Sequence, residues 1–329
     1  MKRSAAFAIL IGLGLGITLY VSNDLTSIFD LLLNTGWGIL LVVCLHIPQT
    51  LFSVFGWRVL IGDGRPPRLW LLYRLRWIRE SANALLPMAQ IGGDLVRSRL
   101  LAQEGVRLTT AVASSMVDLS VEMAAQIIFT VFSMGLLLMG AHNSGAFPIA
   151  VGTTAASCLI GIAFMAAQRF GMFKLVERAI ARSAAGAKWA FLGDLTGLNE
   201  TVVALYRHPR RLLASGAYHL ISWALGALET YAAMRVLGID GSLREAAILE
   251  GLGQAVRGLA FFVPGALGVQ EGGYLLICGM FGISPQKALA LSLIRRIREL
   301  ALGVPGLILW HRLEGRLIAR AAAAEMATQ

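Results

Sequence analysis

The chain has 329 residues, of which 57% are hydrophobic and only 15% are charged. A mean hydropathy of +0.69 excludes an ordinary soluble domain and is typical of a chain whose solvent is the lipid bilayer. The net charge of +10 comes without a recognisable nucleic-acid-binding fold, so we interpret it as attraction to anionic lipid head groups and expect no nucleic-acid partner.

Six apolar runs are long enough to cross a bilayer, which takes about 20 helical residues. They lie at about 4–22, 36–61, 108–138, 148–167, 212–236 and 285–310. The first run is not followed by an A-x-A-like cleavage site, so we interpret it as a span and not as a signal peptide. The segments 70–104 and 244–282 each contain charges, a proline and a glycine cluster. Because proline breaks a helix and glycine permits tight turns, we predict that each forms a re-entrant pair of half-helices.

The basic residues predict the orientation of the chain. The links at 23–35 and 139–147 contain no Lys or Arg, whereas the link at 168–211 is rich in both. A basic cluster also follows the second span, at Arg65, Arg68, Arg74, Arg76 and Arg79. The positive-inside rule therefore places both termini and the 168–211 link in the cytoplasm. Basic residues alternate with apolar ones in this link, which is typical of helices that lie on an anionic membrane surface.

One stretch of the chain occurs twice. Pro87 is followed seven residues later by Asp94, and Pro264 is followed seven residues later by Glu271. The same offset of 177 residues matches Gly105, Ala111, Ala113, Ser115, Glu122 and Ala124 with Gly282, Ala288, Ala290, Ser292, Glu299 and Ala301. Internal repeats in a membrane chain are typical of transporters whose site lies at the repeat interface.

The two copies are predicted to cross the membrane in opposite senses. The basic cluster follows the span at 36–61, but Arg210 and Arg211 precede the equivalent span at 212–236. The span at 36–61 is therefore expected to run inwards and the span at 212–236 outwards, as in an inverted repeat.

The predicted fold is an all-α polytopic membrane protein with about six transmembrane helices and two re-entrant helix pairs. It forms one membrane domain over 1–329. A first half at 36–167 and a second half at 212–311 form the inverted repeat, and the cytoplasmic link at 168–211 joins them.

Acidic residues follow both predicted helix breaks. Half-helices that begin after Pro87 and Pro264 would direct their N-terminal amides towards the middle of the protein, where they favour anions such as a lipid phosphate. Asp94 and Glu271 either cap these half-helices or belong to a substrate site. Arg97 and Arg99, one turn beyond Asp94, are candidates for contact with a lipid phosphate.

Further charges lie in the third and sixth predicted spans. Asp118 and Glu122 are one turn apart on one helix face, and their equivalents at the offset of 177 are Arg295 and Glu299. A charge in mid-span costs about 2.5–3.5 kcal/mol, so these residues are expected to face the interior and to pair. We predict that Asp118 or Glu122 pairs with Arg295 or Arg298. Such a pair either contacts substrate or only holds the halves together.

Other polar residues are weaker candidates. Arg257, in the second re-entrant segment, is a candidate for contact with a lipid phosphate. Glu229 and Glu250 are lesser candidates. His46 and His219 are interpreted as hydrogen-bonded packing residues. The three cysteines form no disulfide framework and no metal motif, and we expect no cofactor.

Two motifs resemble a known family. RESANALLPMAQIGGDLVRSRLL, followed by GVRLTTAVASSMVDLSVE, is similar to the first signature of the lysylphosphatidylglycerol-synthase-type transmembrane family, also called flippase-like. FFVPGALGVQEGGYLL, followed by GISPQKALALSLIRRIREL, is similar to the second. The DLSVE sequence resembles the branch associated with hopanoid biosynthesis. Because the chain ends about twenty residues after the last predicted span, we expect it to lack the soluble synthase domain of the best-known relatives.

The resemblance implies a protein of the bacterial inner membrane that moves a polar-headed or phosphate-bearing lipid between leaflets. Its partners are expected to be membrane lipids, together with further copies of the chain or lipid-biosynthesis enzymes. We predict a translocase and no enzymatic activity. Two alternatives stay open, namely a lipid-modifying enzyme with Asp94 and Glu271 as acid and base, and a non-transporting scaffold of a lipid-biosynthesis complex.

Overall fold

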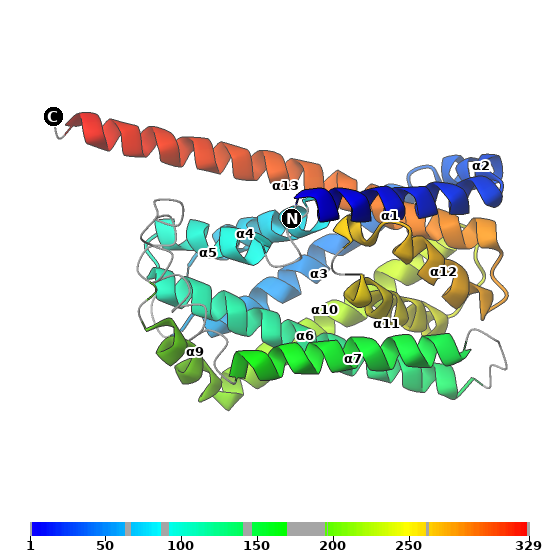
Figure 1. Cartoon of the computed structure of the whole chain (residues 1–329), viewed down its shortest axis with the longest axis horizontal. Coiled ribbons are helices and arrows are strands. Elements are labelled where there is room, and N and C mark those ends of the chain that lie inside the picture. The colour runs from blue at the N-terminus through cyan, green and yellow to red at the C-terminus, as the bar shows by residue number, and fades with distance from the viewer. Residues whose placement is uncertain are drawn as a thin grey trace.

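The computed structural model describes residues 2–62, 67–86, 92–140, 147–169, 195, 197–260 and 263–327. Over these residues the chain forms twelve α-helices and one short 3₁₀ helix, with no strand (Figure 1). The helices are α1 Lys2–Ser22, α2 Leu25–Thr35, α3 Gly38–Leu60, α4 Leu69–Leu85, α5 Gly92–Gln103, α6 Leu108–Leu138, α7 Phe147–Arg169, α9 Leu198–Tyr206, α10 Pro209–Val236, α11 Leu243–Leu259, η2 Pro264–Ala266, α12 Val269–Gly279 and α13 Pro285–Ala327. The predicted all-α class is confirmed over the part of the chain that is described.

Three helices are long and apolar enough to cross a membrane, judged by length and composition over the described residues. They are Gly38–Leu60, Leu108–Leu138 and Phe147–Ala167. The other three predicted spans also form helices, namely α1, α10 and α13. In α10 and α13 charged residues interrupt the apolar sequence, and the apolar part of α1 among the described residues is the short stretch Leu10–Ser22. Membrane crossing by these three helices stays a prediction.

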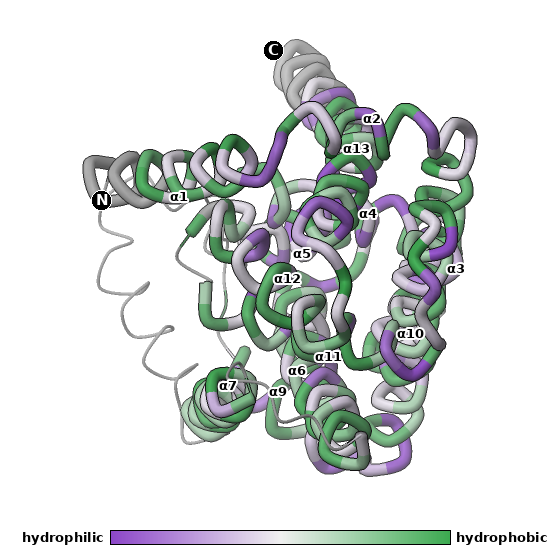
Figure 2. The backbone as a smooth tube through the Cα atoms, turned by 90° about the vertical axis from the view of Figure 1, so that its right-hand side faces the viewer, coloured by the Kyte–Doolittle hydropathy of each residue, from purple (hydrophilic) through white to green (hydrophobic). Residues whose placement is uncertain are grey.

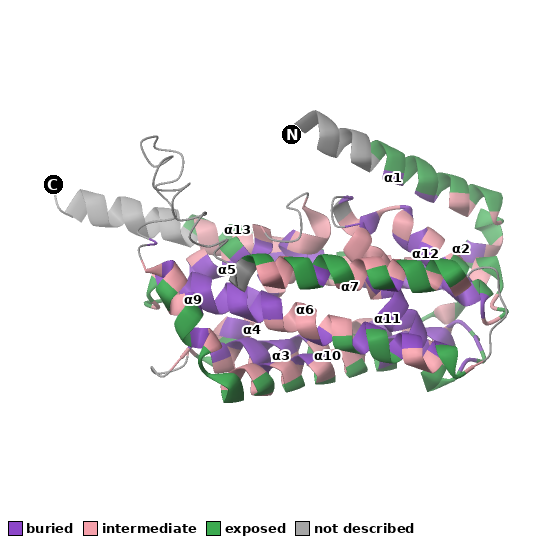
Figure 3. Ribbon diagram, turned by 60° about the horizontal axis from the view of Figure 1, so that its bottom comes forward, coloured by how far each residue is buried: buried purple, intermediate pink, exposed green. Residues whose placement is uncertain are grey.

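Large apolar side chains face outwards from the bundle. Leu33 and Trp37, for example, are 78% and 86% exposed. Exposed residues follow the outer faces of α1 and α7 (Figure 3), and α7, at the edge of the bundle, is predominantly apolar (Figure 2). An apolar exterior around a partly polar interior is what a lipid solvent selects.

Each predicted re-entrant segment contains two short helices separated by a break. In the second half, α11 and α12 flank the break, and Pro264 begins η2 there. Gly265 and Gly268 have φ values of 62° and 74°, which glycine adopts without steric cost. In the first half the break lies between α4 and α5, and Pro87 is outside the described residues. The helix breaks are therefore confirmed, whereas entry from opposite sides of the membrane stays a prediction.

Helices α3 and α10 pack antiparallel along their length. Ser53 Oγ lies 2.9 Å from Ser222 Oγ, and His46 Nδ1 lies 2.9 Å from Glu229 Oε2. A step of seven residues back along α3 thus corresponds to seven residues forward along α10. This register brings polar groups of the two halves together in the middle of the molecule.

Equivalent residues meet at the centre of this contact. Gln49 and Gly226 are related by the offset of 177, and a Cβ atom added to Gly226 would lie 3.0 Å from Gln49 Nε2. Helices α5 and α12 begin 177 residues apart, as do α6 and α13. The colours of Figure 1 show that α6 and α13 run in opposite directions along the long axis of the molecule.

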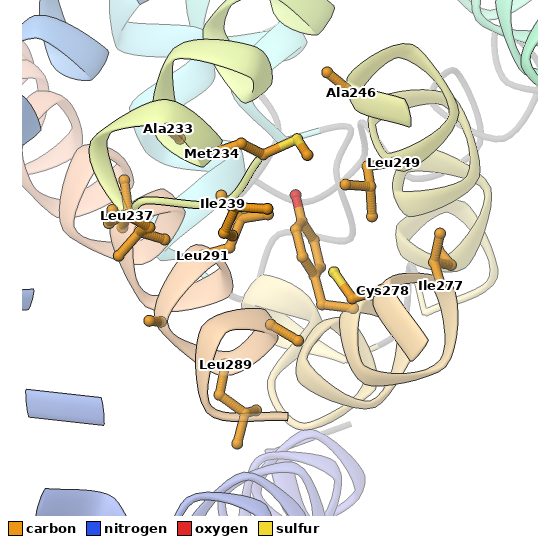
Figure 4. Packing of buried hydrophobic residues seen from close by; sticks show 14 of the residues in the cluster. Ala233, Met234, Leu237, Ile239, Ala246, Leu249, Ile277, Cys278, Leu289 and Leu291 are labelled. Atoms are coloured by element: carbon orange, nitrogen blue, oxygen red, sulfur yellow. The ribbon is translucent and has the colours of Figure 1, made fainter. Parts of the chain in front are cut away.

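The halves are also interleaved, since α4 packs against α13 of the second half and α11 packs against α6 of the first. The largest apolar core joins α10, α11, α12 and α13, where Met234, Leu249, Ile277 and Leu291 converge (Figure 4). This core packs the helices of the second half together.

Candidate functional site

A cavity of about 480 Å³ lies between the two halves. Helices α3, α4 and α6 of the first half and α10, α11 and α13 of the second contribute side chains to its wall, and α7 adds Ile160 and Phe164. The charged residues in the wall are Arg76, Arg79, Glu80, Glu122, Arg257, Arg295, Arg298 and Glu299. A polar cavity built from both halves at the centre of an apolar bundle is the candidate functional site.

The cavity also has an apolar part. Trp223 from α10 and Met123 from α6 lie in the wall, together with Ile160 and Phe164 from α7. The site can therefore contact both a charged group and hydrocarbon, as an amphipathic ligand requires.

Helix α4 supplies the arginines of the first half. Arg76 Nε lies 2.7 Å from Glu80 Oε1, and its terminal nitrogens lie 2.5 Å from Glu122 Oε1 and 3.5 Å from Asp118 Oδ2. Arg79 lies 3.0 Å from both Glu122 Oε2 and Asp94 Oδ1. Spacings of three and four residues put these groups on one face of α4, so a single helix turn can bind both acids of α6.

Arg97 forms the deepest part of this network, behind the cavity wall. It is fully buried, and its Nη2 lies 2.8 Å from Asp94 Oδ1 and 2.9 Å from Asp118 Oδ2. The guanidinium also stacks over the ring of Trp57 at 4.4 Å, an attractive cation–π contact. His219 Nε2 of α10 lies 2.9 Å from the other oxygen of Asp118, which connects the network to the second half.

The second half has a corresponding network in which the signs are partly exchanged. Arg295, at the position equivalent to Asp118, lies 2.6 Å and 2.8 Å from the two carboxylate oxygens of Glu250 on α11. Tyr274, equivalent to Arg97, accepts a third hydrogen bond from Arg295 at 2.8 Å. A two-pronged contact of this kind is the strongest geometry for a buried ion pair.

Three further arginines complete this network. Arg296 lies 3.1 Å from Glu271 and 3.2 Å from Glu299, and Glu299 also pairs with Arg257. Arg298 lies 2.5 Å from Glu229 of α10.

The predicted pairing of Asp118 or Glu122 with Arg295 or Arg298 is wrong. The acids of α6 pair instead with arginines of α4 and α5, and the arginines of α13 pair with acids of α10, α11 and α12. The physical reason is proximity. The acids of α6 lie closer to the arginines of α4 and α5 than to those of α13.

The ten predicted site residues occupy three different environments. Those in the cavity wall are Glu122, Arg257, Arg295, Arg298 and Glu299. Those behind the wall, buried in the ion-pair networks, are Asp94, Arg97, Asp118 and Glu271. Arg99 lies away from the cavity and pairs with Glu314 at 2.6 Å.

The helix-break acids lie in the first turns of α5 and α12, as predicted. Asp94 and Glu271 meet the guanidinium groups of Arg79, Arg97 and Arg296 there. In this position a carboxylate also interacts favourably with the helix dipole. The two alternatives, capping and substrate binding, are therefore joined by a third role as ion-pair partners.

The three charged wall residues of α4 and both histidines of the wall were not predicted as site residues. Arg76 and Arg79 were assigned to the cytoplasmic basic cluster, but they are only 2% and 7% exposed. Glu80 was not singled out, and His46 was expected only to pack. His46 does form the expected hydrogen bond, to Glu229, but it also lines the cavity. The spacing of Arg76, Arg79 and Glu80 on one helix face within an otherwise apolar segment was the available signal.

The site can bind charge without a metal. The described residues contain no cluster of His, Cys, Asp and Glu that could hold a metal ion. Guanidinium groups bind phosphate oxygens as readily as carboxylate oxygens. A phosphate that enters the cavity can therefore replace a carboxylate as the partner of an arginine.

Residues 5–306 match the family model described as the lysylphosphatidylglycerol synthase TM region. This match covers both halves of the chain and every residue of the cavity wall. No curated protein and no solved structure matches the chain.

Proposed function

We propose that this chain, which belongs to the lysylphosphatidylglycerol synthase transmembrane family, is a translocase that moves a phosphate-bearing lipid between the leaflets of the bacterial inner membrane. The family and the apolar helices establish a membrane protein related to lipid handling. The proposal has three further parts: the lipid moves without chemical change, both termini are cytoplasmic, and the substrate is linked to hopanoid metabolism.

The observation that carries the proposal is the composition of the cavity wall. Arginines and carboxylates from both halves surround a space of about 480 Å³, and α7 adds apolar side chains on one side. A lipid has the same division, because its head group is charged and its tails are apolar. The head group would lie among the arginines while the tails stay in the bilayer.

The antiparallel packing of α3 and α10 supports a mechanism of alternating access. Gln49 and Gly226, equivalent residues of the two halves, meet at its centre, as expected near the axis of an inverted repeat. Rocking of one half against the other about this contact would open the cavity to each side of the membrane in turn.

Reconstitution into liposomes tests the proposal. The full chain is inserted into vesicles of phosphatidylethanolamine and phosphatidylglycerol that contain a fluorescent phosphatidylglycerol, and a membrane-impermeant quencher reports the outer-leaflet fraction. Movement of the probe with no change in lipid mass supports a translocase. A changed lipid mass would indicate the enzyme alternative, and a static, unmodified probe together with co-purifying biosynthetic enzymes would indicate the scaffold.

Arg257→Gln is the informative variant, because Arg257 lies in the wall with its charge directed at Glu299. Loss of one charge-assisted hydrogen bond, about 1.5–3 kcal/mol, should slow probe movement roughly tenfold or more. Arg235→Gln is the matched control, since Arg235 is exposed at the end of α10 and pairs with Asp240. Equal rates in the two variants would remove Arg257 from the substrate site.

A further inference from the structure

His46 lies where the two halves meet, and its ring contacts charged groups from three other helices. Nδ1 lies 2.9 Å from Glu229 Oε2 on α10 and 3.2 Å from an Nη atom of Arg298 on α13. Nε2 faces Glu80 Oε2 on α4 at 3.8 Å. His46 thus has a carboxylate of the first half on one side and a carboxylate of the second half on the other.

The surroundings of Nδ1 favour two different protonation states. Glu229 can only accept a hydrogen bond, so it favours a proton on Nδ1, whereas Arg298 can only donate and favours a bare Nδ1. Both partners are within hydrogen-bond distance, but one nitrogen satisfies only one of them at a time.

The charged groups that surround the ring also have other partners, and Arg298 lies 2.5 Å from Glu229. On α4, Glu80 accepts hydrogen bonds from Arg76 and Thr50. On α6, Asp118 and Glu122 are held by arginines of α4 and α5. Neutral and protonated states of His46 therefore differ mainly in which of Glu80, Glu229 and Arg298 the ring contacts.

We infer that His46 is a proton-binding site that couples lipid movement to a proton gradient. In the protonated state Nδ1 donates to Glu229 of the second half, and the positive ring also attracts Glu80 of the first half, which lies 3.8 Å from Nε2. In the neutral state Nδ1 accepts from Arg298 and both interactions are lost. Because His46 lines the cavity, a proton can reach it from the same side as the substrate. This inference rests on the proposed function, since it requires that lipid moves.

The reconstituted full chain tests the inference. Movement of fluorescent phosphatidylglycerol is compared with and without a pH difference across the vesicle membrane, imposed in each direction. A pH-sensitive dye inside the vesicles reports proton movement. We expect a pH difference of one polarity to accelerate the lipid and lipid movement to be accompanied by protons.

His46→Gln keeps hydrogen-bonding capacity but cannot titrate, so the acceleration and the proton movement should both be lost. Glu229→Gln, which removes the negative charge beside Nδ1, should weaken both. His311→Gln is the control, because His311 is exposed on α13, and it should respond as the unaltered chain does. Gel filtration of each purified variant separates these effects from misfolding.

Three results would count against the inference, and they differ in what else they affect. Lipid movement that ignores a pH difference of either polarity, or a His46→Gln variant that keeps the acceleration, would overturn the inference and leave the translocase standing. No lipid movement under any condition would overturn the proposed function and the inference with it.

Discussion

Among individual residues, side chains that are close in sequence bind different partners in different environments. Arg97 and Arg99 were predicted together as contacts for a lipid phosphate. Two residues along a helix turn the side chain to nearly the opposite face. Arg97 is therefore fully buried between Asp94 and Asp118, whereas Arg99 reaches Glu314 at the surface.

This difference predicts that the same substitution at the two positions lowers the free energy of unfolding by unequal amounts. Arg97→Met removes the cation that two buried carboxylates share and should lower the free energy of unfolding by about 3–5 kcal/mol. Arg99→Met removes a partly exposed pair and should cost about 1 kcal/mol or less. Unfolding in mixed detergent micelles, followed by tryptophan fluorescence, measures both. Equal costs would contradict the assignment of Arg97 to the buried network.

At the scale of elements, the α4–α5 and α11–α12 pairs position the charges. Proline and glycine in the sequence predicted where these helices break, and the structure confirms helices on both sides of each break. Their packing was not predictable from the breaks, because it depends on close contacts between backbones. Gly93 of α5 is such a contact, since its N–H donates to Asn83 Oδ1 at 2.9 Å and an added Cβ would lie 2.4 Å from the carbonyl oxygen of Arg79.

Gly93→Ala should therefore destabilise the α4–α5 pair, by about 1–3 kcal/mol for an overpacked contact. Gly272→Ala, in α12 of the other half, adds its Cβ to open space and should be neutral or stabilising by about 0.5–1 kcal/mol. The same micelle unfolding assay compares the two. A stable Gly93→Ala variant would mean that α5 does not approach α4 so closely.

At the scale of the whole molecule, the contact of α3 with α10 joins two halves that largely neutralise their own charges. Asp118 is held by arginines, and its equivalent Arg295 is held by Glu250. The contact itself is polar in its centre, where Ser53 meets Ser222 and His46 meets Glu229. Polar contacts of this kind can exchange partners during a rocking motion more readily than an interlocked apolar core can.

A disulfide tests both the register and the motion. Ser53→Cys with Ser222→Cys should form a cross-link, because the two hydroxyl oxygens are 2.9 Å apart and disulfides need Cα atoms within about 7 Å. The background replaces the three native cysteines with alanine. If the halves rock, the oxidised protein should lose lipid movement and regain it on reduction.

Ser53→Cys with Ser215→Cys is the control, since Ser215 lies two turns away along α10. It should not cross-link. Proteolytic cleavage between the halves followed by gel electrophoresis detects a cross-link as a mobility shift. The antiparallel register would be contradicted by a cross-link in the control pair and none in the test pair.

Composition and motifs alone were enough to predict a helical membrane chain of this family. They were also enough to predict that charges in apolar helices must be paired, because a lone charge in a bilayer is too costly. Which charges pair with which depends on how the helices pack in three dimensions. Asp118 or Glu122 was expected to pair with Arg295 or Arg298, but the acids are bound by arginines of the first half and the arginines by acids of the second. His46, interpreted from sequence as a packing residue, lies between carboxylates of both halves. Partner choice depends on distances of a few ångströms between helices far apart in sequence, and a linear pattern does not contain those distances.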